Sequence, residues 1–369
     1  MSWWCIAISG GICLVRTDNM QAMTEYYEAL LRFVRDPYCG PKIVVIGGGT
    51  GLATLLRGLK IFTYQLTAVV TVADDGGSSG LLRRDMGILP PGDIRNCLMA
   101  LADTEPLMTE LMNYRFRNGR LSGHNFGNLF IAAMSEVCGN FFDAVTNFSE
   151  VLRVRGRVLP VSLEDITIRA ELADGSVIEG EHSIGERRAT PGNPIRRIRM
   201  TPEQAPAFEQ AVAAIDAADL IICGPGSLYT SIIPDLLFPE VVAAIRRSTA
   251  PRIFVCNLMT QPSETMGYDC SDHIRAVLDH VGMETAKGLF DYCVASDSPI
   301  SPETLLRYAE QSAEPVVFDR KAVEALGVRL VTVPLATVEE EKLRHDHVLL
   351  ARTVLSLGLR HAAERGANV

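Results

Sequence analysis

Four glycines in five positions, Gly47-Gly-Gly-Thr-Gly51, restrict the fold of this chain more than any other feature. They follow the β-branched run Lys42–Ile46 and precede residues 52–59, where apolar side chains recur at helical period. A buried strand, a glycine loop and a helix in this order are typical of a parallel sheet, and they leave backbone N–H groups and a helix dipole free for an anion. We therefore expect the loop to bind phosphate, with a tight turn that binds nothing as the alternative. The expected ligands are Gly47, Gly48, Gly49, Thr50 and Gly51.

This loop matches neither of the two common nucleotide motifs. In the pattern G-x-G-x-x-G the last glycine is replaced by Leu52 or Thr54, depending on where the pattern starts, and no Gly-Lys-Ser/Thr follows. An NAD-dependent dehydrogenase is therefore a weaker hypothesis, also because the sequence contains no evident hydride-handling His or Tyr-x-x-x-Lys.

A second predicted strand, Leu66–Ala73, leads into the polar run 74–80, Asp-Asp-Gly-Gly-Ser-Ser-Gly. An acid in this position of a doubly wound fold contacts a ribose hydroxyl or holds a metal. Adjacent carboxylates point in different directions, so we expect one of Asp74 and Asp75 to face the ligand and the other to cap the glycine turn. We assign Gly76, Gly77 and Ser78 to the ligand site, and Asp74 or Asp75 to a metal.

Two further segments enter helices with polar residues. In PPGDIRN (90–96) we interpret Asp93 as an N-cap. Arg95 and Asn96 would lie in the first turn, where a cation gains nothing from the helix dipole, so an anion better explains Arg95. In GHNFGN (123–128) the side chains of His124, Asn125 and Asn128 can donate to phosphate or carbonyl oxygens.

The second half of the chain repeats the strand-and-loop pattern. Strand Leu220–Cys223 precedes a second glycine-rich loop, and strand Arg252–Cys256 ends in the polar stretch 257–265. Loops at the carboxyl ends of parallel strands converge on one crevice. A serine-hydrolase elbow is disfavoured, because G-x-S-x-G would need glycine at Tyr229. The ligand residues expected here are Gly224, Gly226, Ser227, Tyr229, Thr230, Asn257 and Tyr268.

These patterns predict an α/β fold with a doubly wound, mostly parallel Rossmann-like sheet, a small antiparallel β insertion and a helical C-terminus. Residues 42–150 form a nucleotide-binding half, and 201–369 a second α/β half with C-terminal helices. Residues 151–200 alternate as strands with an Asp174-Gly175 turn, and their arginines either face solvent or reach the ligand. We expect residues 1–41 to be an extension, with a start codon placed upstream of Met20 or Met23 as one explanation and a membrane anchor as the weaker alternative.

The amino-acid composition argues against several classes of function. The 369 residues carry 35 Lys and Arg against 44 Asp and Glu, so the net charge is −9, which argues against a nucleic-acid surface. Nine cysteines without a C-x-x-C pair argue against structural zinc and disulfides and favour a reducing cytoplasm. We also expect no membrane span and, by default, a homodimer.

Taken together, the motifs resemble the CofD-like family, most closely its YvcK-type gluconeogenesis-factor branch. They are GGGTG (47–51), TVADDGGSSG (71–80), PPGDIRN (90–96), GHNFGN (123–128), GPGSLYTSIIP (224–234), NLMTQPSETMGY (257–268), SDHI (271–274) and Arg344-His-Asp346. The resemblance extends from about residue 42 to about residue 350.

The resemblance implies one of two functions. The first is a UDP-sugar-binding regulator of gluconeogenic growth and cell shape that acts through a protein partner. The second is an Mg-dependent transfer like that of 2-phospho-L-lactate transferase, with Asp74, Asp75, Asp93 and Asn96 as catalytic residues. In both cases Gly47–Gly51 and Gly224–Thr230 would line a nucleotide cleft, and Tyr268 would lie in the sugar-nucleotide loop.

Overall fold

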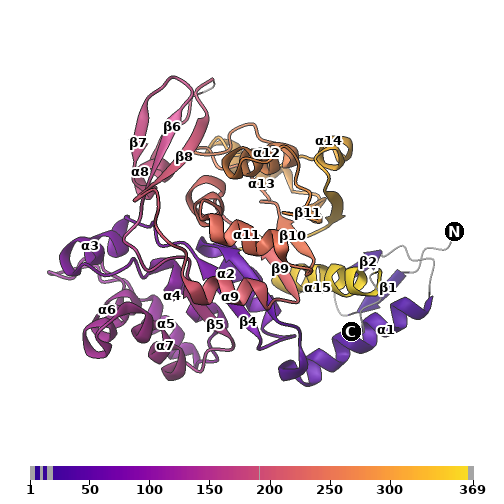
Figure 1. The fold of residues 1–369 in the computed structure, drawn as a ribbon, viewed down its shortest axis with the longest axis horizontal. Helices are drawn as coiled ribbons and strands as arrows, with labels where there is room; N and C mark the ends of the chain where they lie inside the picture. Colours follow the sequence, from indigo (N-terminus) through magenta and orange to yellow (C-terminus); the bar gives the residue numbers. More distant parts are fainter. Residues whose placement is uncertain (1–4, 9–10, 15–19, 191, 365–369) are drawn as a thin grey trace.

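The computed structural model describes residues 5–8, 11–14, 20–190 and 192–364, and it is built on a seven-stranded sheet (Figure 1). The strands are β3 (Ile43–Gly47), β4 (Leu66–Val70), β5 (Arg157–Pro160), β9 (Leu220–Cys223), β10 (Arg252–Val255), β11 (Tyr292–Ser296) and β12 (Arg329–Val333). Every pairing between them is parallel. All residues of β3, β4, β9 and β10 are buried, as expected for strands covered on both faces.

The strand order β12-β11-β10-β9-β3-β4-β5 confirms the doubly wound prediction. From β3 the chain moves outward through β4 to β5. It then returns to β9, on the other side of β3, and continues to β12. The loops that follow β3 and β9 therefore diverge at the centre of the sheet, where open α/β folds form their ligand crevice.

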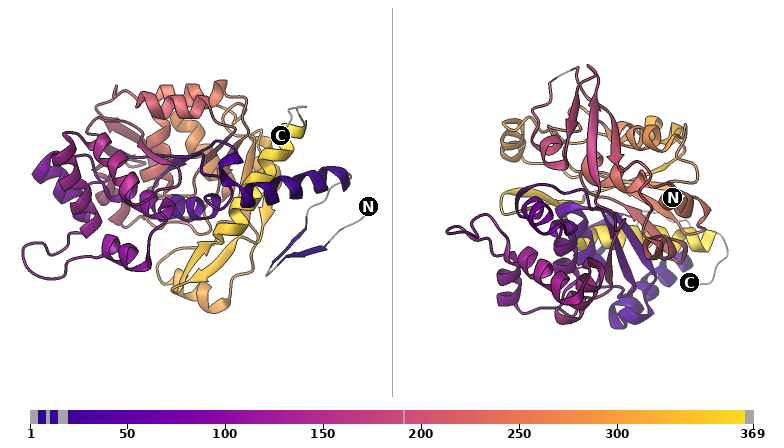
Figure 2. Two further views of the ribbon diagram at one scale, coloured as in Figure 1. Left: turned by 90° about the horizontal axis from the view of Figure 1, so that it is seen from below. Right: turned by 60° about the vertical axis from the view of Figure 1, so that its left-hand side comes forward.

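Helices cover both faces of the sheet (Figure 2). Helix α2 packs against α4 and α15, and α9 packs against α11. The longer helices are α1 (Met20–Arg35), α2 (Gly49–Leu59), α3 (Gly77–Met86), α4 (Gly92–Leu101), α5 (Pro106–Asn113), α6 (Phe126–Cys138), α7 (Phe141–Val151), α9 (Glu209–Asp216), α11 (Pro239–Arg247), α12 (Cys270–Val281), α13 (Pro302–Ala309) and α15 (His347–Glu364). The shorter ones are η1 (Pro37–Cys39), α8 (Glu181–Glu186), η2 (Leu228–Ile232), α10 (Ile233–Leu236) and α14 (Arg320–Ala325). Within the described part of the chain, no single helix is long and apolar enough to cross a membrane, although two sharply bent helix pairs pass that test by length and composition alone.

An antiparallel sheet of order β7-β6-β8 projects from the top of the molecule in Figure 1. Its strands are β6 (Thr167–Leu172), β7 (Val177–Glu179) and β8 (Ile195–Thr201), with α8 between β7 and β8. The predicted insertion is therefore present, but its sheet begins only at Thr167. Residues 157–160, which the sequence placed in the insertion, instead form the edge strand β5 of the main sheet, because they pair in parallel with β4.

Elements near the two ends of the chain flank the main sheet. The strands β1 (Cys5–Ile8) and β2 (Gly11–Leu14) pair with each other and precede α1. At the C-terminal side, β13 (Ala336–Glu339) and β14 (Lys342–His345) form a hairpin that leads into α15. Because β14 contacts α2, the helix that follows the first glycine loop, this hairpin lies close to the predicted phosphate site.

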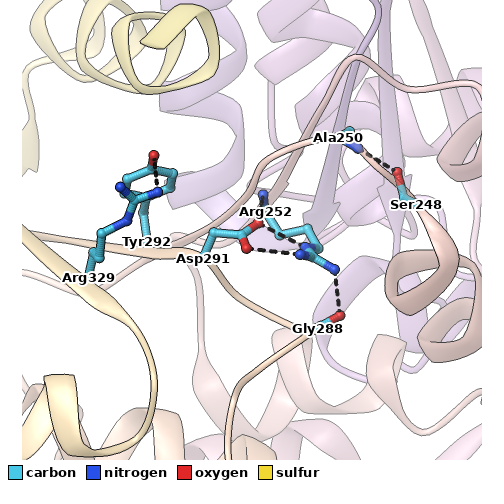
Figure 3. A network of polar contacts seen from close by, with 7 residues as sticks. All are labelled: Ser248, Ala250, Arg252, Gly288, Asp291, Tyr292 and Arg329. Atoms are coloured by element: carbon cyan, nitrogen blue, oxygen red, sulfur yellow. Dashed lines mark hydrogen bonds and ion pairs between the residues drawn. The ribbon is translucent and has the colours of Figure 1, made fainter. Parts of the chain in front are cut away.

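A polar network fixes the amino-terminal edge of β10 and β11 (Figure 3). The guanidinium of Arg252 donates from Nε and Nη2 to the two carboxylate oxygens of Asp291, at 2.9 and 2.8 Å, and from Nη1 to the Gly288 carbonyl at 2.9 Å. Burial raises the pKa of Asp291, but the hydrogen bonds and charge of Arg252 outweigh it and hold that pKa below its ordinary value. This network lies at the edge of the sheet opposite the loops that follow β3 and β9.

Candidate functional site

A cavity of about 260 Å³ lies where the loops after β3, β9 and β10 meet. Its remaining wall is formed by the β14 strand and by one side chain of α13. The lining residues are Gly48, Gly49, Thr50, Gly51, Thr54, Pro225, Gly226, Ser227, Asn257, Leu258, Met259, Thr260, Gln261, Tyr308, Leu343, Arg344 and His345. The structure thus brings together two glycine loops and a polar loop that the sequence assigned to one crevice.

Several glycines are required because the two loops approach each other closely. A Cβ at Gly51 would lie 2.8 Å from the Pro225 carbonyl oxygen, and a Cβ at Gly226 would lie 3.0 Å from the Gly48 carbonyl oxygen. At Gly49 the backbone has φ +72°, a conformation that side chains rarely adopt, and space next to it is open. The glycines therefore let two strand ends meet and leave the start of α2 accessible from the cavity.

Helix α2 begins without a side-chain cap. Its N-cap is Gly48, and the first-turn N–H group of Gly49 donates to Asp93 Oδ2 at 2.9 Å. The other N–H groups at this helix end are not bound by a capping side chain and lie at the cavity wall. A helix N-terminus of this kind favours an anion such as a phosphate.

Two buried acceptors lie among the lining residues. Gln261 donates to Ser227 Oγ at 2.7 Å, but its Oε1 has no hydrogen-bond partner among the residues that the structure describes. His345 Nε2 also has none, although its side chain is only 6% exposed. Burial lowers the pKa of His345 to about 4, against a hydrogen bond to the Cys256 backbone that raises it, so the ring is neutral near pH 7. A ligand with N–H or O–H donors would satisfy both atoms.

The helix start that follows the second glycine loop is occupied by a carboxylate of the protein itself. Glu264 accepts from Tyr229 N at 2.8 Å through Oε2 and from Thr230 Oγ1 at 2.9 Å through Oε1, at the start of η2. Its side chain is 3% exposed, and burial raises its pKa. Tyr229 and Thr230, predicted as ligand residues, are buried and bind Glu264, so the structure places neither in the cavity lining.

Tyr268 also lies outside the cavity lining. Its hydroxyl is 2.7 Å from that of Tyr229, and its ring packs edge-on against Tyr229 and His273. Arg187, which follows α8 of the insertion, donates from Nε to the Ser263 carbonyl at 2.7 Å. One arginine of the insertion therefore reaches the loop after β10, whereas Arg199 pairs with Glu171 on an exposed strand face.

A group of acidic residues, here called the acidic wall, lies next to the first glycine loop and comprises Asp74, Asp75, Asp93 and Glu181. Asp74 Oδ1 accepts from Gly76 N at 2.9 Å, so this carboxylate stabilises the glycine turn. Asp75 Oδ1 accepts from His182 N at 2.8 Å and anchors α8 of the insertion. The two carboxylates therefore have separate roles, and Asp74 caps the glycine turn as one of the pair was expected to do. That the other faces the ligand stays a prediction, since Asp75 bonds the insertion.

Asp93 is not an N-cap, contrary to the sequence-based interpretation. Helix α4 begins at Gly92 with Pro91 as its N-cap, so Asp93 lies in the first turn and is free to accept from Gly49 N. Burial raises the pKa of Asp93 to about 6, and the charge of Asp74 adds to this effect. Burial likewise raises the pKa of Glu181, on α8, to about 8, with contributions from the charges of Asp74 and Asp93. Two carboxyls of this wall therefore titrate near neutral pH.

Gly47 and Gly224 are not among the residues that line the cavity, and the other predicted residues lie at the N-termini of α3, α4 and α6. Asn125 caps α6 by accepting from Asn128 N at 3.1 Å, and its own N–H donates to Ser78 Oγ at 3.1 Å. His124 Nδ1 is 3.4 Å from the same hydroxyl. Arg95 Nη2 donates to Asn96 Oδ1 at 2.6 Å. These residues lie near the acidic wall and do not line the glycine-loop cavity.

The metal predicted at Asp74 or Asp75 remains a prediction. Within the described ranges, no group of three or more His, Cys, Asp and Glu side chains is arranged to hold an ion. Mg²⁺, however, is commonly held by one or two carboxylates together with phosphate oxygens and water. Asp74, with Asp93 beside it, fits that mode better than Asp75, because Asp75 is turned toward the insertion.

Sequence reasoning missed several residues at this site. Four of them lie within the motifs NLMTQPSETMGY and Arg344-His-Asp346, namely Gln261, Glu264, Arg344 and His345. Glu264 could have been found by asking which acid accepts from the N–H groups at the start of the helix after the second glycine loop. No sequence signal marked Tyr308 or Glu181, since each lies in an ordinary helix brought to the site by the tertiary fold.

A larger hollow of about 450 Å³ lies at the opposite edge of the sheet, where β3, β4 and β5 begin. Tyr38, Tyr64 and Arg155 line it. Parallel α/β sheets bind ligands at the carboxyl ends of their strands, so the smaller glycine-loop cavity is the functional candidate.

The family described as 2-phospho-L-lactate transferase CofD matches residues 43–336. The chain belongs to this CofD family. The match ends before β14, so the Leu343–His345 wall of the cavity lies outside the matched region.

Relatives at higher identity place the chain in the gluconeogenesis-factor branch of the family. A protein of Nostoc sp. is 54% identical over 339 residues, which are 90% of this chain and 72% of the relative. The gluconeogenesis factor of Bacillus subtilis is 45% identical over 318 residues, 86% of this chain and 98% of its own. A crystal structure of a Bacillus halodurans protein superposes with a TM-score of 0.81 at 44% identity and covers 86% of this chain and 99% of its own.

Proposed function

We propose that this gluconeogenesis factor binds a nucleotide in the glycine-loop cavity, with a UDP-sugar as the first candidate. The proposal depends above all on the pairing of two features in one cavity. The uncapped start of α2 suits a phosphate, and two residues lining the same cavity carry buried acceptors, Gln261 Oε1 and His345 Nε2, that have no partner among the described residues. A nucleotide carries both complements, because its phosphates are anionic and its ribose and base present O–H and N–H donors.

Binding, rather than a covalent reaction, is the simplest role for this cavity. Its lining residues include no Cys–His or Ser–His–Asp arrangement. We infer that ligand occupancy shifts a conformational equilibrium that a protein partner senses, and so couples carbon metabolism to cell shape in the cytoplasm. A homodimer is the expected assembly, as the commonest oligomer.

Calorimetry with UDP-sugars tests this proposal directly. We expect micromolar affinity in the wild type and a loss of about 100-fold or more in Gly226→Asp, because its side chain would enter the space beside Gly48 and place a negative charge against the phosphates. Gly185→Asp is the matched control, since Gly185 is exposed on α8 with open space around it. Absence of heat with every UDP-sugar, GDP and NAD would refute nucleotide binding.

The acidic wall supports a second candidate, a transferase of the 2-phospho-L-lactate type. Asp93 and Glu181 have pKa values raised to about 6 and about 8, which suits proton exchange at neutral pH. Mg²⁺ held by Asp74 and Asp93 would offset phosphate charge, while this chain's own residues position the two substrates. If a deazaflavin and a phospholactyl nucleotide yield no coupled product with Mg²⁺ present, this candidate fails.

A further inference from the structure

Three buried cysteines meet where β10, β11 and α12 come together. Cys256 directly follows β10, Cys270 is the first residue of α12, and Cys293 lies in β11. Cys256 is 1% exposed and the other two are fully buried. The Sγ atoms of Cys270 and Cys293 are 3.3 Å apart, and the Cys256 thiol also hydrogen-bonds Cys270. Since a disulfide holds its sulfur atoms about 2.05 Å apart, closing this pair takes a relative shift of about 1.3 Å.

The three thiols are not equivalent, because Cys270 lies between the other two. Hydrogen bonds from the thiols of Cys256 and Cys293 lower the pKa of Cys270 below its ordinary value, although burial and the charge of Asp269 oppose them. The same hydrogen bonds, together with burial, raise the pKa values of Cys256 and Cys293, which act as the donors. Cys270 also stands in the first turn of the twelve-residue helix α12, whose dipole favours a thiolate. Cys270 is therefore the nucleophile of the group, and a second thiol lies in contact with it.

Other cysteines of the described chain lack this combination. Cys39 is exposed, but its thiol donates to Asp36 Oδ2 at 3.0 Å, and this hydrogen bond raises its pKa. Burial raises the pKa values of Cys97 and Cys223, and no described thiol is bonded to either. An exposed thiol that is hard to ionise and a buried pair with an activated member have opposite reactivities toward an oxidant small enough to enter the core.

We propose that Cys270 and Cys293 form an oxidation site for a small hydroperoxide such as hydrogen peroxide. The Cys270 thiolate attacks one peroxide oxygen, the O–O bond breaks, and the hydroxide that leaves takes up the proton lost by Cys270. Cys270 is then a sulfenic acid. The Cys293 sulfur attacks the Cys270 sulfur, the S–O bond breaks, and the second hydroxide leaves as water with the proton of Cys293. Two thiols thus lose two hydrogen atoms in all, and one peroxide is reduced to two molecules of water.

The disulfide would act on the loop that follows β10. This loop carries Asn257 and Gln261 of the glycine-loop cavity at its start, and it ends at Cys270. A bond to Cys293 ties the end of the loop to β11 in the centre of one half of the sheet. In a reducing compartment the pair remains two thiols until peroxide appears. The site thus goes beyond the proposed nucleotide binding, and it adds a redox input to the segment that lines the cavity.

Disulfide mapping tests this site without any nucleotide. The full-length protein is fully reduced, exposed to hydrogen peroxide while folded, alkylated, and digested for mass spectrometry. We expect one linked peptide pair, Cys270 with Cys293, lighter by two hydrogen atoms and separated again by dithiothreitol. In Cys293→Ser the linked pair should be lost, and the Cys270 peptide should gain an oxygen atom. Cys223→Ser is the matched control, since it removes a buried cysteine that has no thiol neighbour, and it should form the linked pair as the wild type does.

Three results would overturn the proposal. The first is a wild type without the Cys270–Cys293 bond at peroxide concentrations that oxidise the exposed Cys39. The second is a bond from Cys270 to Cys256 in its place. The third is a bond that forms only in urea, because oxidation would then belong to the unfolded chain. If Cys293→Ser does not fold, the wild-type map still decides. Since no step uses a nucleotide, failure of the nucleotide proposal would leave this result unchanged, and the reverse also holds.

Discussion

The two glycine loops share a local pattern and differ in what fills them. Each follows a buried strand and precedes a helix: Gly47–Gly51 after β3, and 224–227 after β9. In the first, one N–H group donates to Asp93, and the rest of the helix start faces a cavity. In the second, residues 225–227 also line that cavity, but the helix start behind them is closed, because Glu264 accepts from Tyr229 N and Thr230 Oγ1. The helix start after such a loop can therefore be open to a ligand or closed by the protein, depending on whether another segment already supplies the acceptor.

Removal of Glu264 is the strongest test of this difference between the two loops and has the largest expected effect. Glu264→Ala leaves the buried donors at Tyr229 and Thr230 without an acceptor, so we expect the free energy of unfolding to fall by about 3 kcal/mol in urea denaturation. Glu264→Gln, which keeps an oxygen at similar positions, should lose less. Glu314→Ala is the control, because Glu314 is an exposed glutamate and its removal should change stability by under about 0.5 kcal/mol. Equal stability of Glu264→Ala and this control would show that Glu264 does not hold the second loop.

The pH dependence of stability tests the raised pKa values of Asp93 and Glu181, two carboxyls of the acidic wall next to the first glycine loop. Asp93 has its pKa raised from 3.8 to about 6, and Glu181 from 4.5 to about 8. The folded state therefore binds more protons than the unfolded state in these ranges, and stability falls as pH rises, by at most about 1.4 kcal/mol per pH unit for each proton. We expect Asp93→Asn to flatten the stability curve between about pH 4 and 6, and Glu181→Gln to flatten it up to about pH 8. A curve that keeps its wild-type slope in both variants would contradict the raised values.

Tyr268 provides the smallest expected effect. It bonds Tyr229 beside the closed loop and does not line the cavity, so Tyr268→Phe should lower the free energy of unfolding by about 1 kcal/mol and change UDP-sugar affinity less than twofold. Tyr114→Phe, at an exposed tyrosine, is the matched control for the loss of a hydroxyl. A tenfold loss of affinity in Tyr268→Phe would instead support the sequence-based hypothesis that Tyr268 contacts the sugar.

Much of the fold could be predicted because its signals are local. The run Lys42–Ile46 and the glycines after it specify a strand, a turn and a helix within about twenty residues, and the repeat of this strand-and-loop pattern along the chain extended the prediction to the doubly wound sheet. The edge strand β5 was misplaced because Arg157–Pro160 is short and has no pattern that separates it from the antiparallel strands that follow. Asp93 was misread because an acid in a first turn and an N-cap look alike in sequence.

By itself, the sequence determined which segments become strands ending in polar loops, since backbone preference and hydrophobic period act over neighbouring residues. Only the tertiary structure decided which of the helix starts after those loops is open. Glu264 reaches Thr230 across 34 residues of chain, and His345 reaches the first glycine loop from a hairpin near the other end. Such contacts depend on the packing of distant elements, and an anion site exists only where that packing leaves backbone donors without a partner.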